Sequence, residues 1–196
     1  MNRKETFLQV MEPADAVFGF KSLKNIADIL EDDGFFEAPA STRYHGAYEG
    51  GLFDHSLNVM NNLLLFTDRY YLDWCRPQSP YLIGMFHDLC KMDNYIEKDP
   101  ELCVEDEEGY MVSYSYNSHM ILKGHGEKSV MIASTLCSLT KEEVACIRYH
   151  MGAFCDKSEW NDYTNAIHVC PNVLWTHQAD MVASHILEVD RTEGNR

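Results

Sequence analysis

Apolar residues recur at helical spacing along most of this 196-residue chain, and one segment departs from that pattern. The helical patterns cover, to within a few residues, 13–30, 54–70, 80–90, 126–139, 141–150 and 171–187. Between residues 94 and 117, apolar and aromatic residues stand on both sides of an acidic EDEEG run, which is typical of a β-hairpin. The sequence therefore predicts an all-α helical bundle with a small β-hairpin insertion at about residues 94–117.

Turn-forming and capping residues mark the ends of several predicted helices. Pro13 suits a first helical turn, and Gly34 suits the stop that follows. Residues 38–51 are rich in glycine and polar side chains, which indicates a loop. Asp54 then stands where it can cap the next helix. We expect one side of that helix to carry the apolar residues Leu57, Met60, Leu64 and Leu65.

The charge balance limits the partners that such a chain can bind. Acidic residues number 31 and basic residues 16, which gives a formal net charge of −15. Phosphate backbones are bound mainly by lysine and arginine, so the composition argues against a long nucleic acid duplex as ligand. Hydrophobic residues make up 45% of the chain, which favours a folded globule over disorder. No internal repeat or low-complexity linker divides the sequence, so we expect a single domain over residues 1–196.

The cysteines and the hydrophobic runs indicate a compartment. Seven cysteines are present, an odd number, and no two of them form a C-x-x-C pair. No apolar run approaches the roughly 20 residues that span a bilayer, and the first residues lack the apolar core of a signal peptide. The sequence therefore predicts a cytoplasmic protein with reduced thiols, bound to no membrane.

Histidine and aspartate residues recur in a fixed order along successive predicted helices. Five of the six lie close to a helix end, where several helices of a bundle can meet. Imidazole and carboxylate groups together suit divalent metals such as Mn, Fe, Co, Ni or Zn, and facing helices can supply them. The candidate ligands are, in chain order, His55, His87, Asp88, His125, His150 and Asp180.

The candidate ligand set is compatible with one metal ion or with two. Four protein ligands serve a single ion, whereas four histidines and two aspartates, with one carboxylate as a bridge, serve two ions about 3.5–4 Å apart. His87 and Asp88 are neighbours and point about 100° apart on a helix. Both can reach one site only if it lies at the end of their helix.

Several tracts resemble the HD-domain metal-dependent phosphohydrolases, whose two-metal branch has the pattern H…HD…H…H…D. The resemblance is greatest to the HD module of 3′→5′ exoribonucleases and covers about residues 38–188, with 1–37 as a helical N-terminal extension. Its most specific part is G-G-L-x-x-H, at residues 50–55. The tracts that carry it are, in chain order, APASTRYHGAYEGGLFDHSLNV, FHDLCK, GHGEKSV and YHMG.

The resemblance implies a role for each candidate ligand. It implies that His55, His87, Asp88 and Asp180 bind a first metal ion, and that His125 and His150 bind a second, with Asp88 as the bridge. Two further residues match family positions that lie near the substrate. These are Lys91, which in many HD proteins contacts substrate or assists a proton transfer, and His45 in the loop before the first ligand.

Two departures from the family pattern stand out. Cys90 occupies the position of the glycine in the usual H-D-x-G-K run, which leaves the geometry of that loop open. The nucleic-acid-binding OB domain that precedes the HD module in those exoribonucleases does not precede it in this sequence, where about 40 residues come first.

The resemblance implies hydrolysis of a phosphate ester or phosphodiester. The cofactors expected are two divalent ions, drawn from Mn, Fe, Mg, Co, Ni or Zn, which activate a water molecule. The acidity of the chain favours a small nucleotide or a short oligonucleotide as substrate. Two alternatives stay open, because the same ligands occur in di-iron oxygenases of the myo-inositol oxygenase type, and a metal can also stabilise a regulatory protein with little activity. The sequence predicts no oligomeric state.

The remaining histidines and the tyrosines have plainer interpretations. His177 lies three residues before Asp180 on the same predicted face, where it either supports a ligand or serves the fold. We expect no functional role for His119, His168 and His185. The alternating tyrosines of the hairpin are expected to share one face; they are Tyr110, Tyr114 and Tyr116.

Overall fold

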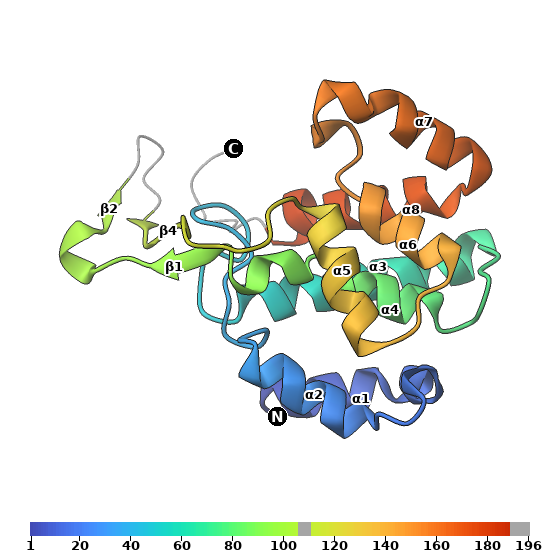
Figure 1. Ribbon diagram of the computed structural model, residues 1–196, viewed down its shortest axis with the longest axis horizontal. Coiled ribbons are helices and arrows are strands. Elements are labelled where there is room, and N and C mark those ends of the chain that lie inside the picture. Colours follow the sequence, from blue (N-terminus) through green and yellow to red (C-terminus); the bar gives the residue numbers. More distant parts are fainter. Residues whose placement is uncertain (106–110, 189–196) are drawn as a thin grey trace.

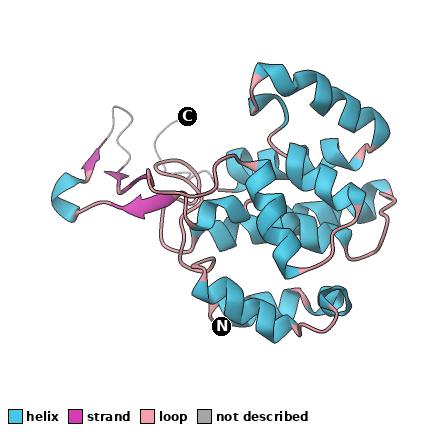
Figure 2. Cartoon of the chain, in the orientation of Figure 1, coloured by secondary structure: helices cyan, strands magenta, loops and turns pink. Residues whose placement is uncertain are grey.

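The computed structural model describes residues 1–105 and 111–188. Helices dominate these residues, and two short antiparallel strand pairs form the only β-structure among them, as Figures 1 and 2 show. The α-helices are α1 (Arg3–Val10), α2 (Leu23–Asp32), α3 (Gly51–Tyr70), α4 (Ser79–Phe86), α5 (Gly126–Leu136), α6 (Lys141–Tyr149), α7 (Trp160–Val169) and α8 (Asn172–Val182). The predicted all-α class with a small β insertion is confirmed.

Helix α3 runs through the middle of the bundle and packs against both α4 and α8. Helix α6 packs against α5 and α8, so the helices after the hairpin cover the other side of the same core. Val59, Met60 and Leu63 of α3 are fully buried or nearly so, as are Met85 and Phe86 of α4. The helix ends on one side of this core position the polar residues described below.

Gly84 sets the distance between α3 and α4. A Cβ atom added at this position would lie 2.3 Å from the Cα of Met60, which is a backbone atom that cannot turn aside. Only a residue without a side chain lets the two helices approach this closely.

Replacing Gly84 by alanine is expected to destabilise the fold, although alanine is the better helix former. The added methyl group must push α3 and α4 apart, which costs about 1–3 kcal/mol of unfolding free energy. Urea denaturation measures it, with Ser134→Ala on the exposed side of α5 as the control. A G84A variant as stable as the control would show that the helices can separate without cost.

The N-terminal residues fold differently from the single helix expected over 13–30. Helix α1 comes first, a short 3₁₀ helix at Glu12–Phe18 follows, and α2 begins only at Leu23. Gly19 has a φ of 61°, outside the range of a right-handed helix, so the helix ends there. The Ser22 side chain then caps α2 by accepting from the Asn25 amide. The extension shares the core of the bundle: Phe7 contacts Phe36, and Phe35 and Phe36 contact Phe53 of α3, through edge or tilted ring contacts with centroids 5.3–6.0 Å apart.

Helix α3 begins earlier than the sequence predicts. Its first residue is Gly51, so Asp54 is not the cap; it lies in the first turn and accepts two bonds from Arg3, at 3.1 and 3.2 Å. The predicted apolar side is also too wide, since Leu65 is 60% exposed. Leu65 directly follows Leu64, so its side chain points about 100° away from that of Leu64 and out of the core.

Three further helix boundaries differ from the prediction. Helix α4 ends at Phe86 instead of near residue 90, and a short 3₁₀ helix follows at Leu89–Met92. Helix α7 lies in a segment for which no helix was predicted; none of its residues is fully buried, although Tyr163, Ala166 and Ile167 pack against the core at helical spacing. The predicted helix 171–187 consists of α8 and a π-helical turn at Ala183–Leu187.

The predicted β insertion is a hairpin that projects from the bundle (Figure 1). Strand β1 (Tyr95–Glu97) pairs with β4 (Tyr114–Tyr116), and β2 (Val104–Glu105) pairs with β3 (Met111–Val112). A 3₁₀ turn at Pro100–Leu102 separates β1 from β2. Residues Tyr114 and Tyr116 stand two apart on β4 and so share a face, whereas Tyr110 and most of the acidic run lie outside the described residues.

None of the helices within residues 1–105 and 111–188 is long and apolar enough to cross a membrane. This agrees with the lack of a long apolar run in the sequence.

Candidate metal centre

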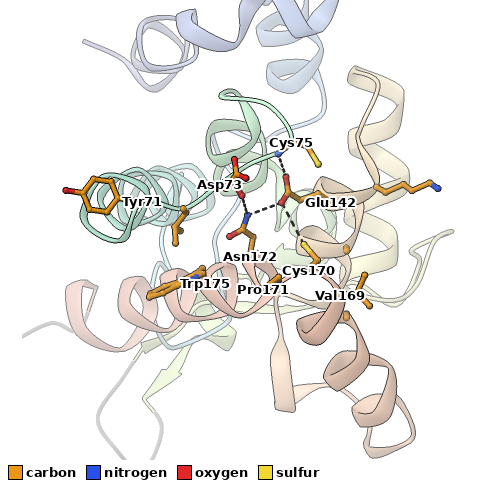
Figure 3. Close-up of a pocket in the computed structure, with 13 residues that line it drawn as sticks. Tyr71, Asp73, Cys75, Glu142, Val169, Cys170, Pro171, Asn172 and Trp175 are labelled. Atoms are coloured by element: carbon orange, nitrogen blue, oxygen red, sulfur yellow. Dashed lines mark hydrogen bonds between the residues drawn. The ribbon is translucent and has the colours of Figure 1, made fainter.

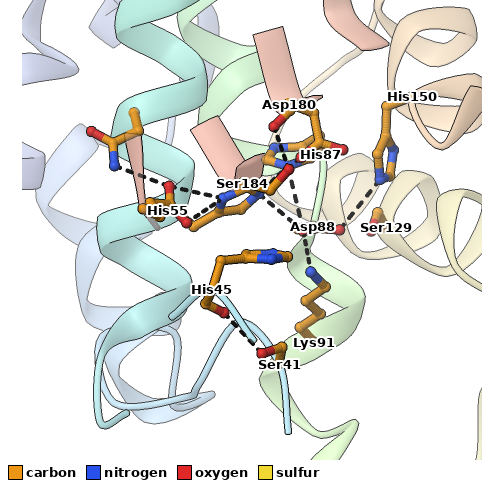
Figure 4. Close-up of polar contacts among 12 residues, drawn as sticks. Ser41, His45, His55, His87, Asp88, Lys91, Ser129, His150, Asp180 and Ser184 are labelled. Carbon is orange, nitrogen blue, oxygen red and sulfur yellow. Dashed lines mark hydrogen bonds and ion pairs between the residues drawn. The ribbon is translucent and has the colours of Figure 1, made fainter. Parts of the chain in front are cut away.

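The six predicted ligands come from five separate segments and meet at one place in the bundle. His55 lies in the second turn of α3, and Asp180 lies within α8. The break after α4 provides two of the others, and the remaining two stand at the start of α5 and the end of α6. These four are His87, Asp88, His125 and His150. Figure 4 shows the convergence of all of them except His125.

The carboxylate of Asp88 lies at the centre of the group. Its Oδ2 atom faces one imidazole pair, 3.6 Å from His55 Nε2 and 3.4 Å from His87 Nε2. Its Oδ1 atom faces the other pair, 2.8 Å from His125 Nε2 and 3.3 Å from His150 Nε2. One carboxylate thus presents a different oxygen to each pair, which is the arrangement that a bridging ligand needs.

Helix ends fix the orientation of two of these rings. His87 and His150 each occupy the C-cap of a helix, where the last carbonyl groups have no partner in the helix. His87 Nδ1 donates to Gly84 O at 2.8 Å, and His150 Nδ1 donates to Ile147 O at 2.7 Å. Since a carbonyl only accepts, the ring proton is assigned to Nδ1. The Nε2 lone pair of each ring therefore points into the cluster.

His55 is oriented in the same way by a carboxylate. Its Nδ1 lies 3.1 Å from both oxygens of Glu188 and donates to that group. Its Nε2 lies 3.2 Å from Asp180 Oδ1 and 3.3 Å from His87 Nε2. Two Nε2 lone pairs that face each other across 3.3 Å repel unless a proton or a cation lies between them.

These features fit a metal ion. Metal-ligating histidines usually donate their second ring nitrogen to a carbonyl or carboxylate, as three of these rings do. His150 Nε2 is buried and makes no hydrogen bond, although Asp88 Oδ1 lies 3.3 Å away. An unpartnered nitrogen in such a place is costly unless a cation binds it. Within residues 1–105 and 111–188, every group of ligand atoms close enough for a shared cation involves this cluster or its neighbours His45, Cys90 and Glu188.

The charges of the cluster stabilise each other strongly. Burial would raise the pKa of Asp88, but the Lys91 ammonium and the adjacent imidazoles hold it well below its usual range. Burial would likewise raise the pKa of Asp180, which His55 lowers instead. Burial alone would lower the pKa of His55. The hydrogen bonds to Asp180 and Glu188 outweigh that effect and raise the pKa to about 9. Both carboxylates are therefore ionised at neutral pH and available to a cation.

Lys91 belongs to the cluster by position. Its ammonium nitrogen lies 2.7 Å from Asp88 Oδ2, and the side chain is almost entirely buried. Burial would lower the pKa of Lys91, but the contact with Asp88 raises it above the usual value. A fixed positive charge therefore stands at the same carboxylate that the four imidazoles surround.

His45 lies beside the cluster, in the loop before α3. Its ring centroid is 4.9 Å from that of His55, and its Nε2 atom is buried with no hydrogen-bond partner (Figure 4). The Ser41 hydroxyl donates to His45 O at 2.9 Å and holds the loop in place. Burial and the nearby charge of His55 lower the pKa of His45 to about 4, so the ring is neutral at pH 7.

Glu188 is a residue of the site that sequence reasoning missed. It lies at the end of the last described helical turn, holds His55 Nδ1, and accepts from Asn58 Nδ2 at 3.0 Å. No spacing rule links it to the ligand pattern, because an acidic residue near a helix end is usually a solvated charge. The local signal was the polar residue Asn58, which lies three residues after His55 on α3 and donates to Glu188.

Glu188→Ala is expected to lower metal affinity about 10–100-fold, because His55 would lose the partner that orients its ring. Glu188→Gln should restore most of the loss, since its amide oxygen can still accept from Nδ1. Competition with a chelator measures both constants, and Glu12→Ala, at an exposed acidic residue, is the control. Equal affinity in all three variants would mean that Glu188 does not position the ligand.

The other histidines lie outside the cluster. His177 Nδ1 donates to the backbone oxygen of His150 at 2.8 Å, so it supports the segment that carries a candidate ligand. His119 and His168 are exposed, and His185 bonds to the hydroxyl of Ser184. Cys90 is buried, and its amide donates to Ser129 Oγ at 3.1 Å, so this loop closes with a cysteine at that position.

Comparison with known proteins adds no further identification. No family model matches the chain, and no match is found among curated protein sequences or among solved structures. Function resides in the residues of a site and their chemistry. A functional proposal for this chain rests on the geometry of the histidine and aspartate cluster.

Proposed function

We propose that this protein is a metal-dependent phosphohydrolase of the HD-domain type, with a two-metal centre. The observation that carries the proposal is the position of Asp88, whose two oxygens face two different imidazole pairs. His55, His87 and Asp180 would hold one ion with Asp88, and His125 and His150 would hold the other. When bound, such ions supply an activated water and positive charge for phosphate oxygens.

The charge of the cluster suits a phosphate ester. Two divalent ions, the carboxylates of Asp88, Asp180 and Glu188, and the Lys91 ammonium sum to a formal charge of about +2 in a largely buried site. An anionic substrate offsets that charge, whereas a neutral one would leave it uncompensated. The net charge of the whole chain repels long polyanions, so we propose a small nucleotide or a short oligonucleotide end as the substrate.

Two side chains of this chain would act on the substrate. The Lys91 ammonium, already at the central carboxylate, would donate hydrogen bonds to a phosphate oxygen or to the departing oxygen. The neutral His45 ring has a buried nitrogen with no partner, so it would bind a polar group of the substrate above His55. Beside the metal ligands, the site would thus offer the substrate the Lys91 ammonium and the neutral His45 ring.

Lys91→Met is expected to retain the metals and to reduce kcat about 10²-fold or more. The change keeps most of the buried side chain and removes the charge that would stabilise developing negative charge on oxygen. Elemental analysis and steady-state kinetics on the same preparation measure the two effects. Lys123→Met, at an exposed lysine, is the control; kinetics equal to those of that control would remove Lys91 from the proposed machinery.

Metal content and a substrate panel together test the proposal. Protein purified without chelator is analysed for metals, then assayed with mononucleotides, cyclic nucleotides and short oligonucleotides, with O₂ uptake recorded in parallel. Two equivalents of metal and phosphate ester hydrolysis are expected. Two irons with substrate-dependent O₂ consumption would instead indicate an oxygenase. Unfolding on chelation, with no turnover of any ester, would indicate a metal-stabilised regulatory protein.

A further inference from the structure

Cys90 lies beside the metal cluster, two residues after Asp88. It is fully buried, in the short 3₁₀ helix at Leu89–Met92. Its sulfur, one oxygen of Asp88 and one ring nitrogen of His125 all lie within 4.8 Å of one another. Ligand atoms of a single ion have separations of this size, because each lies about 2.0–2.3 Å from the metal. The three atoms are thus close enough to share one cation.

The first turn of α5 holds the backbone of Cys90 in place. The Cys90 amide donates to Ser129 Oγ at 3.1 Å, and the Ser129 amide donates to His125 O at 3.1 Å. Since Ser129 follows His125 by four residues, both lie on the same face of the helix start. The segment that carries the sulfur is therefore fixed against the helix that carries the imidazole.

A buried lysine orients an amide toward the sulfur. Lys128 Nζ donates to Asn94 Oδ1 at 2.9 Å, and the lysine is 1% exposed. An ammonium only donates, so the amide oxygen faces Lys128 and the amide nitrogen points away from it. That nitrogen donates to Cys90 Sγ at 3.8 Å. The sulfur is thus a hydrogen-bond acceptor, as the ligand atoms of metal sites commonly are.

His150 gives separate evidence for a cation on this side of Asp88. Its Nε2 atom is buried without a hydrogen bond and lies 3.3 Å from Asp88 Oδ1. The Nε2 atom of His125 lies 2.8 Å from the same oxygen. A buried nitrogen with no partner is costly, and a cation beside Asp88 Oδ1 would supply the missing contact.

The other cysteines have no such neighbours. Among the described residues, which include all seven cysteines, Cys90 alone belongs to a group of metal-ligand atoms. Cys75 and Cys170 line a pocket of about 630 Å³ between the end of α3, the start of α8 and one face of α6 (Figure 3). No histidine lines that pocket. Its Glu142 carboxylate already accepts from the Cys75 amide at 2.6 Å and from Asn172 Nδ2 at 2.9 Å.

We propose that Cys90 is a fourth protein ligand of the second ion, beside Asp88, His125 and His150. The inference rests on the two-metal centre proposed above and adds to it a preference for certain ions. The thiol loses its proton to solvent, and the sulfur supplies an electron pair to the ion with no change of oxidation state. Because a thiolate is a soft ligand, this position should prefer Zn²⁺ or Co²⁺ to Mg²⁺ or Mn²⁺. Zinc can take a fifth ligand, so water can still bind.

Burial protects the thiol when no ion is bound. It raises the pKa of Cys90 to about 12, so the free thiol keeps its proton and is a poor nucleophile. A bound cation reverses this effect, because a coordinating thiol is ionised at neutral pH. These properties suit a metal ligand better than a reactive surface thiol.

Cobalt spectroscopy tests the proposal on the full-length protein. The bound metals are exchanged for Co²⁺, the ions are counted by elemental analysis, and the absorption spectrum is recorded. A thiolate on Co²⁺ gives an intense charge-transfer band in the near ultraviolet, whereas nitrogen and oxygen ligands give weak visible bands. We expect two equivalents of Co²⁺ and the near-ultraviolet band. Two equivalents without that band would overturn the role of Cys90 and leave the metal centre in place, whereas no bound Co²⁺ would overturn both.

Cys90→Ser is expected to remove the charge-transfer band and to lower the affinity of one ion position for Co²⁺ at least about tenfold. The affinity for Mg²⁺ should change little, because Mg²⁺ gains little from a sulfur ligand. Cys146→Ser, at another fully buried cysteine, is the matched control and should keep both the band and the affinity. A band that persists in C90S, or disappears in C146S, would overturn the proposal.

Asn94→Ala provides a second test that keeps Cys90 in place, in case C90S does not fold. The sulfur would lose its N–H donor, which raises the energy of its lone pair. The charge-transfer band should therefore move to longer wavelength, with both ions retained. An unshifted band would mean that the ligating sulfur is not the one that Asn94 contacts, and the assignment to Cys90 would be wrong.

Discussion

Asp88→Asn is expected to lower the rate of the proposed hydrolysis about 10³-fold or more. It should also reduce bound metal from the two equivalents expected to less than one. Asparagine offers a single neutral oxygen where Asp88 presents two charged ones to the two imidazole pairs. The change keeps the volume of the side chain, so the loss would reflect ligand chemistry. Elemental analysis, with kinetics at saturating added metal, measures it.

Stability has to be followed in the same variant, because Asp88 also neutralises the buried ammonium of Lys91. An uncompensated buried charge costs about 3–5 kcal/mol, so some loss of unfolding free energy is expected without metal. Asp93→Asn is the matched control: the Asp93 carboxylate pairs with the buried ammonium of Lys128, and the substitution keeps the backbone bond from its amide to Lys91 O. A folded D88N protein that keeps both metals and full activity would refute the bridging role.

His125→Ala combined with His150→Ala is expected to leave no more than one metal equivalent per chain. These two rings face Asp88 Oδ1, whereas the ligands proposed for the other ion face Asp88 Oδ2 or lie beside Asp180. Removing one half of the set should therefore spare the other half. Elemental analysis counts the ions, and the catalytic rate should fall with the loss of the second.

A double variant of two exposed histidines, His119→Ala with His168→Ala, provides the control for that experiment. It removes the same number of imidazoles without touching the cluster, so metal content and rate should equal those of the native protein. Two retained equivalents in the H125A/H150A protein would mean that these residues are not ligands and that the second ion lies elsewhere.

Much of the fold could be predicted because each helix has its own local signal. The apolar period of α5 and α6 is regular, and the boundaries found, 126–136 and 141–149, lie within a few residues of those expected. The hairpin was visible because its strands carry apolar and aromatic residues on both sides of an acidic run in the sequence. The prediction missed α7, none of whose residues is fully buried, and it placed the start of α3 near Asp54 instead of at Gly51.

The candidate site was partly visible for a related reason. His87 and His150 stand where helices end, and a C-cap histidine finds an unpaired carbonyl three residues back for its Nδ1. Their placement at helix ends could be read from the sequence, and with it the chance that the rings share a site. Glu188 could not be found in this way, because its contact with His55 spans most of the chain and follows no local period.

The sequence by itself determined the helical class and the place of the hairpin, since these depend on residue type and short spacing, and it predicted six candidate ligands that the structure brings together. Only the tertiary structure decided that Asp88 turns one oxygen to each imidazole pair and that Glu188 holds His55. Such contacts join residues far apart in the chain. Their geometry depends on how whole helices pack, which no local pattern encodes.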